Sequence, residues 1–119
     1  MPGERNAGEA PAAAWVDVCA LDDIVPDTGA CAMLANLQVA IVRVGEGEEV
    51  YAISNYDPFS KAFVISRGIV GDKAGSPKIA SPVYKQSFDL RTGVCLEDSK
   101  VALPTYEVRV RGGRVEIFV

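Results

Sequence analysis

The chain has 119 residues, with 12 Lys and Arg, 16 Asp and Glu and no His, so its formal charge is −4. This length suits a single domain with its own core. The basic residues are scattered, which argues against a nucleic-acid partner. No apolar run reaches the roughly 20 residues that cross a bilayer. Without histidine, Ser–His and Cys–His nucleophile pairs and imidazole zinc sites are excluded.

The N-terminal residues 1–14, MPGERNAGEAPAAA, consist mainly of Ala, Gly, Pro and charged residues. This composition predicts a disordered tail. It lacks the apolar centre of a signal peptide, so we expect a cytoplasmic protein. The domain itself is expected to span residues 15–119.

The first half of the chain predicts strands. Residues 14–21, AWVDVCAL, alternate apolar and polar positions, as a half-buried strand does. Asp, Pro and Gly in residues 21–30 then break the pattern. The continuous apolar run in residues 38–44 predicts a strand buried on both faces. Residues 45–49, GEGEE, would turn this strand into a second one at 50–54.

Between residues 63 and 104 the signals weaken, because Gly and Pro separate short apolar pieces. The best candidate for a helical turn is 61–64. The glycine-rich stretch 68–76, GIVGDKAGS, lacks the G-K-[ST] ending of a phosphate loop and predicts a mobile surface loop. Short strands are expected at residues 78–82, 87–90 and 93–97.

The C-terminal residues 105–119 give the clearest pattern. Apolar and polar residues alternate on both sides of Gly112–Gly113, a dipeptide that favours a two-residue primed turn. The predicted facing pairs are Val110–Val115, Val108–Ile117 and Arg109–Glu116. Short strands with Gly/Pro turns throughout predict an all-β fold, an antiparallel β-sandwich or small barrel with at most a short helical turn.

The polar and sulfur-bearing residues give few chemical signals of their own. Cys19, Cys31 and Cys95 are widely spaced, which predicts small apolar residues on strands or in turns rather than disulfides or a metal site. Asp57 precedes a proline, so its side chain is expected to close a turn. Phe88 is predicted in the core.

Two segments resemble the cluster loops of Rieske-type domains: residues 54–68, SNYDPFSKAFVISRG, and 81–98, SPVYKQSFDLRTGVCLED. In that family a Cys and a His from each loop bind the two irons of a [2Fe-2S] cluster. Here the four ligand positions are occupied by Asp57, Phe59, Ser81 and Tyr84. Carboxylate and hydroxyl oxygens replace thiolate poorly on iron–sulfur, and Phe cannot bind iron. We therefore expect no metal or cofactor in this chain.

Over residues 15–119 the chain further resembles the small subunit of assimilatory NAD(P)H-dependent nitrite reductase. The most specific stretches are D-P-F-S at 57–60 and S-R-G-I-V-G at 66–71. The resemblance implies a Rieske-like fold and an accessory role without catalytic residues. It also implies a large partner subunit, carrying FAD, siroheme and [4Fe-4S], that reduces nitrite to ammonia.

In Rieske domains the loop tips face the electron partner, so the resemblance makes these tips a candidate partner-binding site. An aromatic pair beside a lysine is typical of interface anchors. Alternatively, Phe59 and Tyr84 fill the space that a cluster would occupy. Two other functions stay open: a stand-alone Rieske-type ferredoxin with unusual ligands, and a free β-sandwich interaction or ligand-binding module. The candidate partner-binding residues are Asp57, Pro58, Phe59, Tyr84 and Lys85.

Overall fold

The computed structural model describes residues 13–119. Most of the predicted tail, residues 1–12, lies outside this range. At its inner end Ala14 exchanges two backbone hydrogen bonds with Val119, at 2.9 and 3.1 Å. Helical structure in residues 13–119 is limited to 3₁₀ turns at Leu21–Asp23 and Ile65–Arg67. None of the described helical segments has the length and apolar character needed to cross a membrane.

The described chain is all-β, and its strands pair antiparallel, which confirms the predicted fold class. The strands are β1 (Trp15–Ala20), β2 (Thr28–Leu34), β3 (Leu37–Arg43), β4 (Val50–Ser54), β5 (Tyr56–Asp57), β6 (Ala62–Phe63), β7 (Ile69–Lys73), β8 (Ser76–Ala80), β9 (Ser87–Asp89), β10 (Thr105–Arg111) and β11 (Arg114–Phe118).

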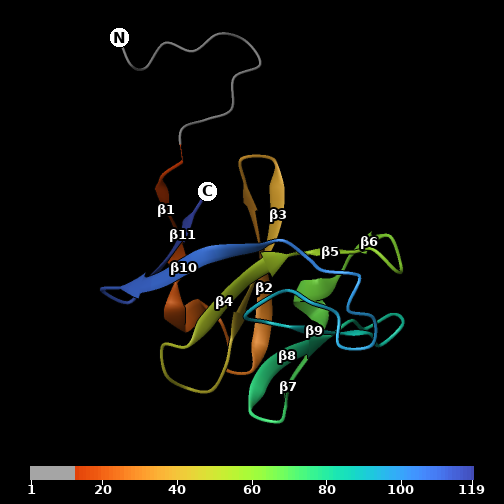
Figure 1. The fold of residues 1–119 in the computed structure, drawn as a ribbon. Coiled ribbons are helices and arrows are strands. Elements are labelled where there is room, and N and C mark those ends of the chain that lie inside the picture. Colours follow the sequence, from red (N-terminus) through yellow and green to blue (C-terminus); the bar gives the residue numbers. More distant parts are fainter. Residues whose placement is uncertain (1–12) are drawn as a thin grey trace, which may run out of the picture.

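A six-stranded sheet brings strands from both ends of the chain together, in the order β1-β11-β10-β4-β3-β2 (Figure 1). The pairing of β1 with β11 shifts register at a bulge between Asp17 and Cys19. β1 and β2 are the two edges of this sheet. A groove lined in part by Val18, Ile24 and Leu34 lies between these edges, so the sheet does not close into a barrel.

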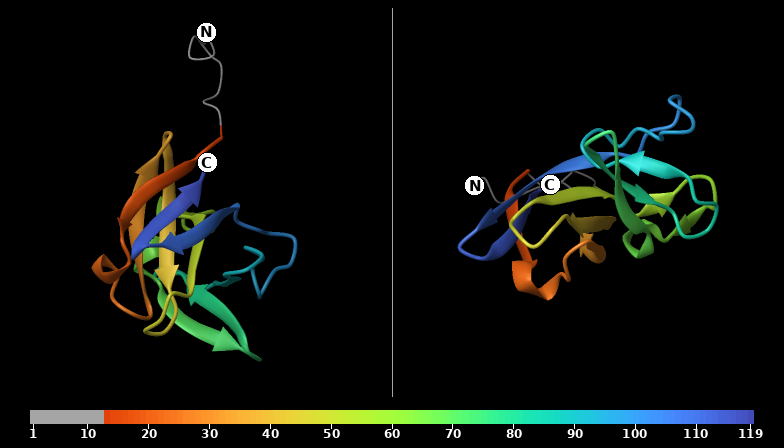
Figure 2. Two further views of the ribbon diagram at one scale, coloured as in Figure 1. Left: turned by 90° about the vertical axis from the view of Figure 1, so that its left-hand side faces the viewer. Right: turned by 90° about the horizontal axis from the view of Figure 1, so that it is seen from below.

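The segment between β4 and β10 folds into a second part beside this sheet. β5 pairs with β6, and β7, β8 and β9 form a three-stranded sheet. Isolated bridges join Phe88 to Cys95 and Val94 to Ala102. Figure 2 shows the two parts side by side, and both segments that resemble cluster loops belong to the second part.

The fold has two apolar cores, of which one joins the two parts and the other lies within the six-stranded sheet. β3 contributes to both: Ala40 and Val42 face the core shared with the second part, whereas Val39 and Ile41 face the core within the six-stranded sheet. This confirms that β3 is buried on both faces. The shared core is completed by Ile53, Ile65, Ile79, Phe88, Leu90, Cys95 and Leu103.

The C-terminal hairpin has the predicted register. Val110 faces Val115, Val108 faces Ile117 and Arg109 faces Glu116. Gly112 and Gly113 have φ angles of 58° and 76°, which is the conformation that a type I′ turn requires at both central positions. The predicted hairpin of β3 and β4 is also present.

Three local predictions for the second part are wrong. Residues 68–76 are mostly a β-hairpin, in which β7 and β8 turn at Ala74 and Gly75 with positive φ. Residues 61–64 contain β6, and the 3₁₀ turn lies at Ile65–Arg67. Residues 93–97 contain only the bridged positions Val94 and Cys95. In the first two cases pairing with neighbouring segments overrides weak local preference. In the third case the segment forms single bridges instead of a continuous strand.

The described ion pairs all lie on the six-stranded sheet and its turns. Arg109 Nε is 2.6 Å from Glu116 Oε1, and Arg114 Nη2 is 2.9 Å from Asp17 Oδ1. The Arg109 guanidinium also lies 3.9 Å from the ring centroid of Trp15. Within residues 13–119 every ion pair uses an arginine and none uses a lysine.

Candidate functional site

The candidate site is built from two loops with the same backbone turn. The first loop, residues 57–61, joins β5 to β6, and the second loop, residues 81–85, joins β8 to β9. The Lys61 N–H donates to the Asp57 carbonyl at 2.7 Å, and the Lys85 N–H donates to the Ser81 carbonyl at 3.1 Å. Both lysines have positive φ, 58° and 67°. Each loop is therefore a single five-residue turn that ends in a left-handed residue.

The first side chain of each loop caps its own turn. Asp57 Oδ1 accepts a hydrogen bond from the Phe59 N–H at 2.9 Å, which confirms that Asp57 closes a turn. Ser81 Oγ accepts one from the Val83 N–H at 3.3 Å. A proline follows in both loops and fixes the next φ near −65°. The sequences D-P-F-S-K and S-P-V-Y-K thus encode the same turn.

A buried hydrogen-bond network joins the two loops. Ser81 Oγ donates to Asp57 Oδ2 at 2.5 Å, and Ser60 Oγ donates to the same oxygen at 2.8 Å. The exposed fractions of Asp57 and Ser81 are 0% and 1%. We call Asp57, Ser60 and Ser81 the loop clasp. A buried carboxylate is stable when donors satisfy both oxygens. Here the two serines donate to Oδ2 and the Phe59 N–H donates to Oδ1.

The environment of Asp57 acts on its pKa in two directions. Burial raises the pKa, because it disfavours the charged form. Hydrogen bonds from Ser81, Ser60 and the Phe59 backbone lower it, and together they outweigh the burial. The pKa of Asp57 therefore lies below its ordinary value, and the clasp contains an ionised carboxylate at neutral pH.

The residues at the four cluster-ligand positions do not fit a [2Fe-2S] cluster. The oxygens of Asp57 and Ser81 bond directly to each other. Phe59 packs against the shared core with its ring centroid 6.2 Å from that of Phe88. Tyr84 is 61% exposed. Within residues 13–119 no group of three or more Cys, Asp or Glu side chains is arranged to hold a metal ion.

The cysteines are free thiols outside the two loops. Cys95 is buried in the shared core. Burial is the main cause that raises the pKa of its thiol, so this side chain is a poor thiolate donor.

The five candidate partner-binding residues lie in different environments. Asp57 is buried, and Pro58 and Phe59 are half-buried. Tyr84 and Lys85 are exposed. The structure thus brings all five into the two joined loops and leaves those of the second loop at the surface.

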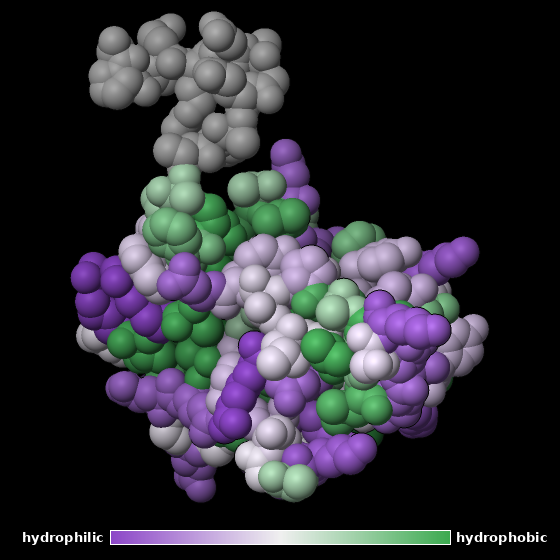
Figure 3. Space-filling model, viewed as in Figure 1, coloured by the Kyte–Doolittle hydropathy of each residue, from purple (hydrophilic) through white to green (hydrophobic). Residues whose placement is uncertain are grey.

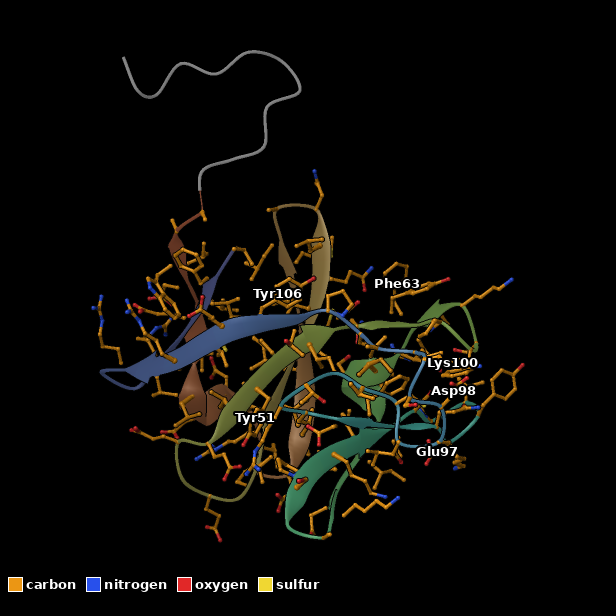
Figure 4. The ribbon with its side chains drawn as sticks, viewed as in Figure 1. Tyr51, Phe63, Glu97, Asp98, Lys100 and Tyr106 are labelled. Carbon is orange, nitrogen blue, oxygen red and sulfur yellow. The ribbon has the colours of Figure 1, made fainter. Side chains whose placement is uncertain are left out.

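Three further exposed residues flank this site and were missed from the sequence. Phe63 is 52% exposed and packs on Tyr56 at 5.1 Å between ring centroids, Val83 is 46% exposed, and Lys61 is exposed. Figure 4 shows Phe63, Glu97, Asp98 and Lys100 at one end of the molecule, away from Tyr51 and Tyr106. In Figure 3 this right-hand end mixes apolar and hydrophilic residues. The repeated x-Pro-x-x-Lys pattern could have identified Lys61 and Val83.

A buried amide holds the first loop to the six-stranded sheet. Asn55 Oδ1 accepts from the Ser66 N–H at 2.7 Å, and its Nδ2 donates to Gln38 Oε1 at 3.2 Å. The backbone of Asn55 bonds to Gln38 and Ile65. Asn55 therefore fixes where β5 leaves β4, and with it the position of Asp57.

Comparison with known proteins bears directly on this site. The sequence profile of the Rieske-like [2Fe-2S] domain matches residues 14–118. The chain belongs to this family. It is 46% identical to the nitrite reductase (NADH) small subunit of Escherichia coli K12 over 103 residues, which cover 87% of this chain and 95% of that one. It therefore groups with the nitrite reductase small subunits inside the Rieske-like family.

A solved structure and a longer relative extend this result. The NMR structure of the E. coli protein NirD superposes with a TM-score of 0.84 at 44% identity, covering 90% of this chain and 97% of that chain. The large subunit of nitrite reductase [NAD(P)H] from Klebsiella oxytoca is 39% identical over 105 residues. That match covers 88% of this chain but 11% of the large subunit. A domain of this kind is thus part of a longer reductase chain in Klebsiella.

Proposed function

We propose that this chain is the small, accessory subunit of an NAD(P)H-dependent nitrite reductase and contains no iron–sulfur cluster. It would support the reduction of nitrite to ammonia by binding a large subunit in the cytoplasm, and would itself carry no catalytic residue. The observation that carries this proposal is the 46% identity to the E. coli small subunit over nearly its whole length.

The Klebsiella relative supports binding to a large subunit. There a homologous domain is covalently part of the large subunit. Domains that are fused in one protein often contact each other as separate chains in another, because the same surface serves both arrangements. A separate small subunit would meet the large one at a comparable interface.

The chemistry of the loops supports a role without electron transfer. The resemblance to Rieske loops aligns Asp57 and Ser81 with the two cysteine ligands, and their oxygens bond to each other. Iron–sulfur clusters are held by thiolates and imidazoles. The redox cofactors would lie in the large subunit, as FAD, siroheme and [4Fe-4S]. This chain would act by stabilising or orienting that subunit.

The proposed docking site is the joined pair of loops with Asp57, Pro58, Phe59, Tyr84 and Lys85. Tyr84 and Lys85 would contact the large subunit directly. Phe59 and the buried Asp57 would shape the loops from within. An exposed aromatic beside a cation is typical of the residues that dominate binding energy at interfaces.

A reconstitution experiment tests this function. The purified chain, with its iron content measured, is added to the large subunit from the same source, and affinity and nitrite-dependent NAD(P)H oxidation are recorded. We expect binding and increased or stabilised activity with iron-free protein. Tyr84→Ala should weaken binding about tenfold. The matched control is Met33→Ala, because Met33 is a similarly exposed apolar residue on β2, away from the loops. This variant should leave the affinity and the activity unchanged.

The ferredoxin alternative gives the opposite result in the same assay. Stoichiometric iron in the purified chain, with activity proportional to that iron, would overturn the accessory role. Absence of any binding to the large subunit would instead favour a free interaction module.

A further inference from the structure

The two loops form one surface although no metal holds them together. We propose that the Asp57 carboxylate, through its bonds to Ser60 and Ser81, cross-links the loops into a single docking surface in place of a cluster. We further propose that this surface fits an apolar patch bordered by carboxylates on the large subunit. The inference rests on the proposed function and adds the positioning residues, the contact residues and the chemistry of the partner surface.

The position of the clasp supports the cross-linking role. Asp57 is the last residue of β5 and Ser81 follows β8 directly, so their bond joins the starting points of both loops. Each loop is also closed at its other end: Asp57 pairs with Ala62, and the Ser81 N–H donates to the Gln86 carbonyl at 2.8 Å. With both loops closed and their starting points joined, neither loop can shift without breaking a buried bond.

The two positions of the clasp should be interchangeable. Each side chain caps its own turn two residues further on and also takes part in the bond between the loops. An aspartate at 81 could therefore accept from the Val83 N–H and from a serine at 57. The one bond that an exchange would lose is that of Ser60, because its counterpart in the second loop is Tyr84.

Exposed side chains around the clasp define the partner chemistry. Phe63, Val83 and Tyr84 are exposed apolar or aromatic residues. Lys61 and Lys85 end the two loops, are exposed, and join none of the ion pairs in residues 13–119. Asp98 lies at the same end of the molecule (Figure 4), and its Oδ1 accepts a hydrogen bond from the backbone N–H of Lys100. Uncommitted cations around apolar side chains favour a partner surface with an apolar centre and acidic rim.

A residue-exchange experiment tests the inference. Affinity for the large subunit is measured for wild type, Asp57→Ser, Ser81→Asp and the double exchange at a temperature where all are folded. We expect each single variant to lose at least tenfold in affinity. The double exchange should recover most of this loss. Val115→Ala, in the core within the six-stranded sheet, is the control, because it lowers stability without touching the loops.

A second measurement follows loop order in the free chain. Hydrogen exchange of the Phe59 and Val83 amides should accelerate together in either single variant and slow again in the double exchange. If Asp57→Ser does not fold, Ser81→Ala replaces it, since Asp57 then keeps its bonds to Ser60 and Phe59.

Raised ionic strength should weaken wild-type binding, and Lys61→Gln with Lys85→Gln should remove most of that salt dependence.

The failures of the two proposals are distinguishable. Failure of the wild-type chain to bind any large subunit removes the proposed function, and the clasp is then judged by hydrogen exchange alone. Wild-type binding that is equally tight in both single variants overturns the clasp and leaves the proposed function intact. Salt-independent binding overturns the acidic partner surface.

Discussion

The first and second loops have the same turn but use their side chains in opposite ways. Position three of the turn is Phe59 in one loop and Val83 in the other, and position four is Ser60 in one and Tyr84 in the other. Phe59 packs inward on the shared core and Ser60 enters the clasp, whereas Val83 and Tyr84 are exposed. The first loop therefore supplies the support and the second supplies most of the proposed docking surface.

A third copy of this turn shows what its last position requires. In residues 89–93, DLRTG, the Gly93 N–H donates to the Asp89 carbonyl at 2.7 Å, and Asp89 Oδ1 accepts from the Arg91 N–H at 2.8 Å. Gly93 has φ of 80°, and a Cβ there would lie 2.0 Å from the Leu103 carbonyl oxygen. The two loops have lysine at the same position because there the side chain points to solvent.

The largest expected effect is therefore at this third turn. Gly93→Ala should lower the free energy of unfolding by about 3 kcal/mol or more, through backbone strain and the clash with Leu103. Lys61→Gly and Lys85→Gly, at the equivalent positions, should stay within about 1 kcal/mol of wild type. Urea unfolding of the three variants measures this difference. Similar losses in all three would show that the turns are not equivalent.

Asp57→Asn should have the next largest effect. It should lower the free energy of unfolding by about 2 kcal/mol at pH 7, because a charged acceptor of three hydrogen bonds becomes neutral. The folded pKa lies below the unfolded value of about 3.9. The carboxylate therefore stabilises the fold above that value and loses this contribution as pH falls through the folded pKa. The difference between wild type and variant should shrink below about pH 4. A constant difference from pH 7 to 3 would contradict an ionised clasp.

Phe59→Ala and Tyr84→Ala separate support from docking. Phe59→Ala should cost about 2 kcal/mol of stability, less than the loss of a fully buried Phe, because the ring is half-buried. Tyr84→Ala should change stability by about 0.5 kcal/mol or less and should act on binding. Thermal unfolding compares the two. A larger loss of stability at Tyr84 would mean that the second loop fills a core.

A smaller loss than that of Phe59→Ala is expected on the six-stranded sheet. Arg109→Ala removes one partly buried ion pair with Glu116 and a contact with Trp15, and should lower the free energy of unfolding by about 1 kcal/mol. It should leave affinity for the large subunit unchanged. Because Trp15 is the one tryptophan, its fluorescence reports this change directly.

Patterns local in the chain were predictable from sequence, and long-range pairings were not. The register of β10 and β11 follows from alternation and a Gly-Gly turn, so the sequence predicts it. β2 was missed because Thr28–Leu34 contains Gly, Ala and Cys, which have little intrinsic strand preference, and it becomes a strand by pairing with β3. β7 was missed because Gly, Asp and Lys follow its first two residues, and it becomes a strand by pairing with β8.

The candidate site was predictable in its loops and in the turn role of Asp57. The clasp was not, because the bond between Asp57 and Ser81 joins residues 24 positions apart. The inward position of Phe59 was not predictable either, because it depends on packing against Phe88, 29 positions away.

Hydrogen–deuterium exchange on the complex tests the central claim most directly. The chain is compared alone and bound to the large subunit. We predict that binding protects the segments around Phe63 and Tyr84 and leaves the turn between β2 and β3 unchanged. Protection of β2 and β1 with no change in the two loops would contradict the account.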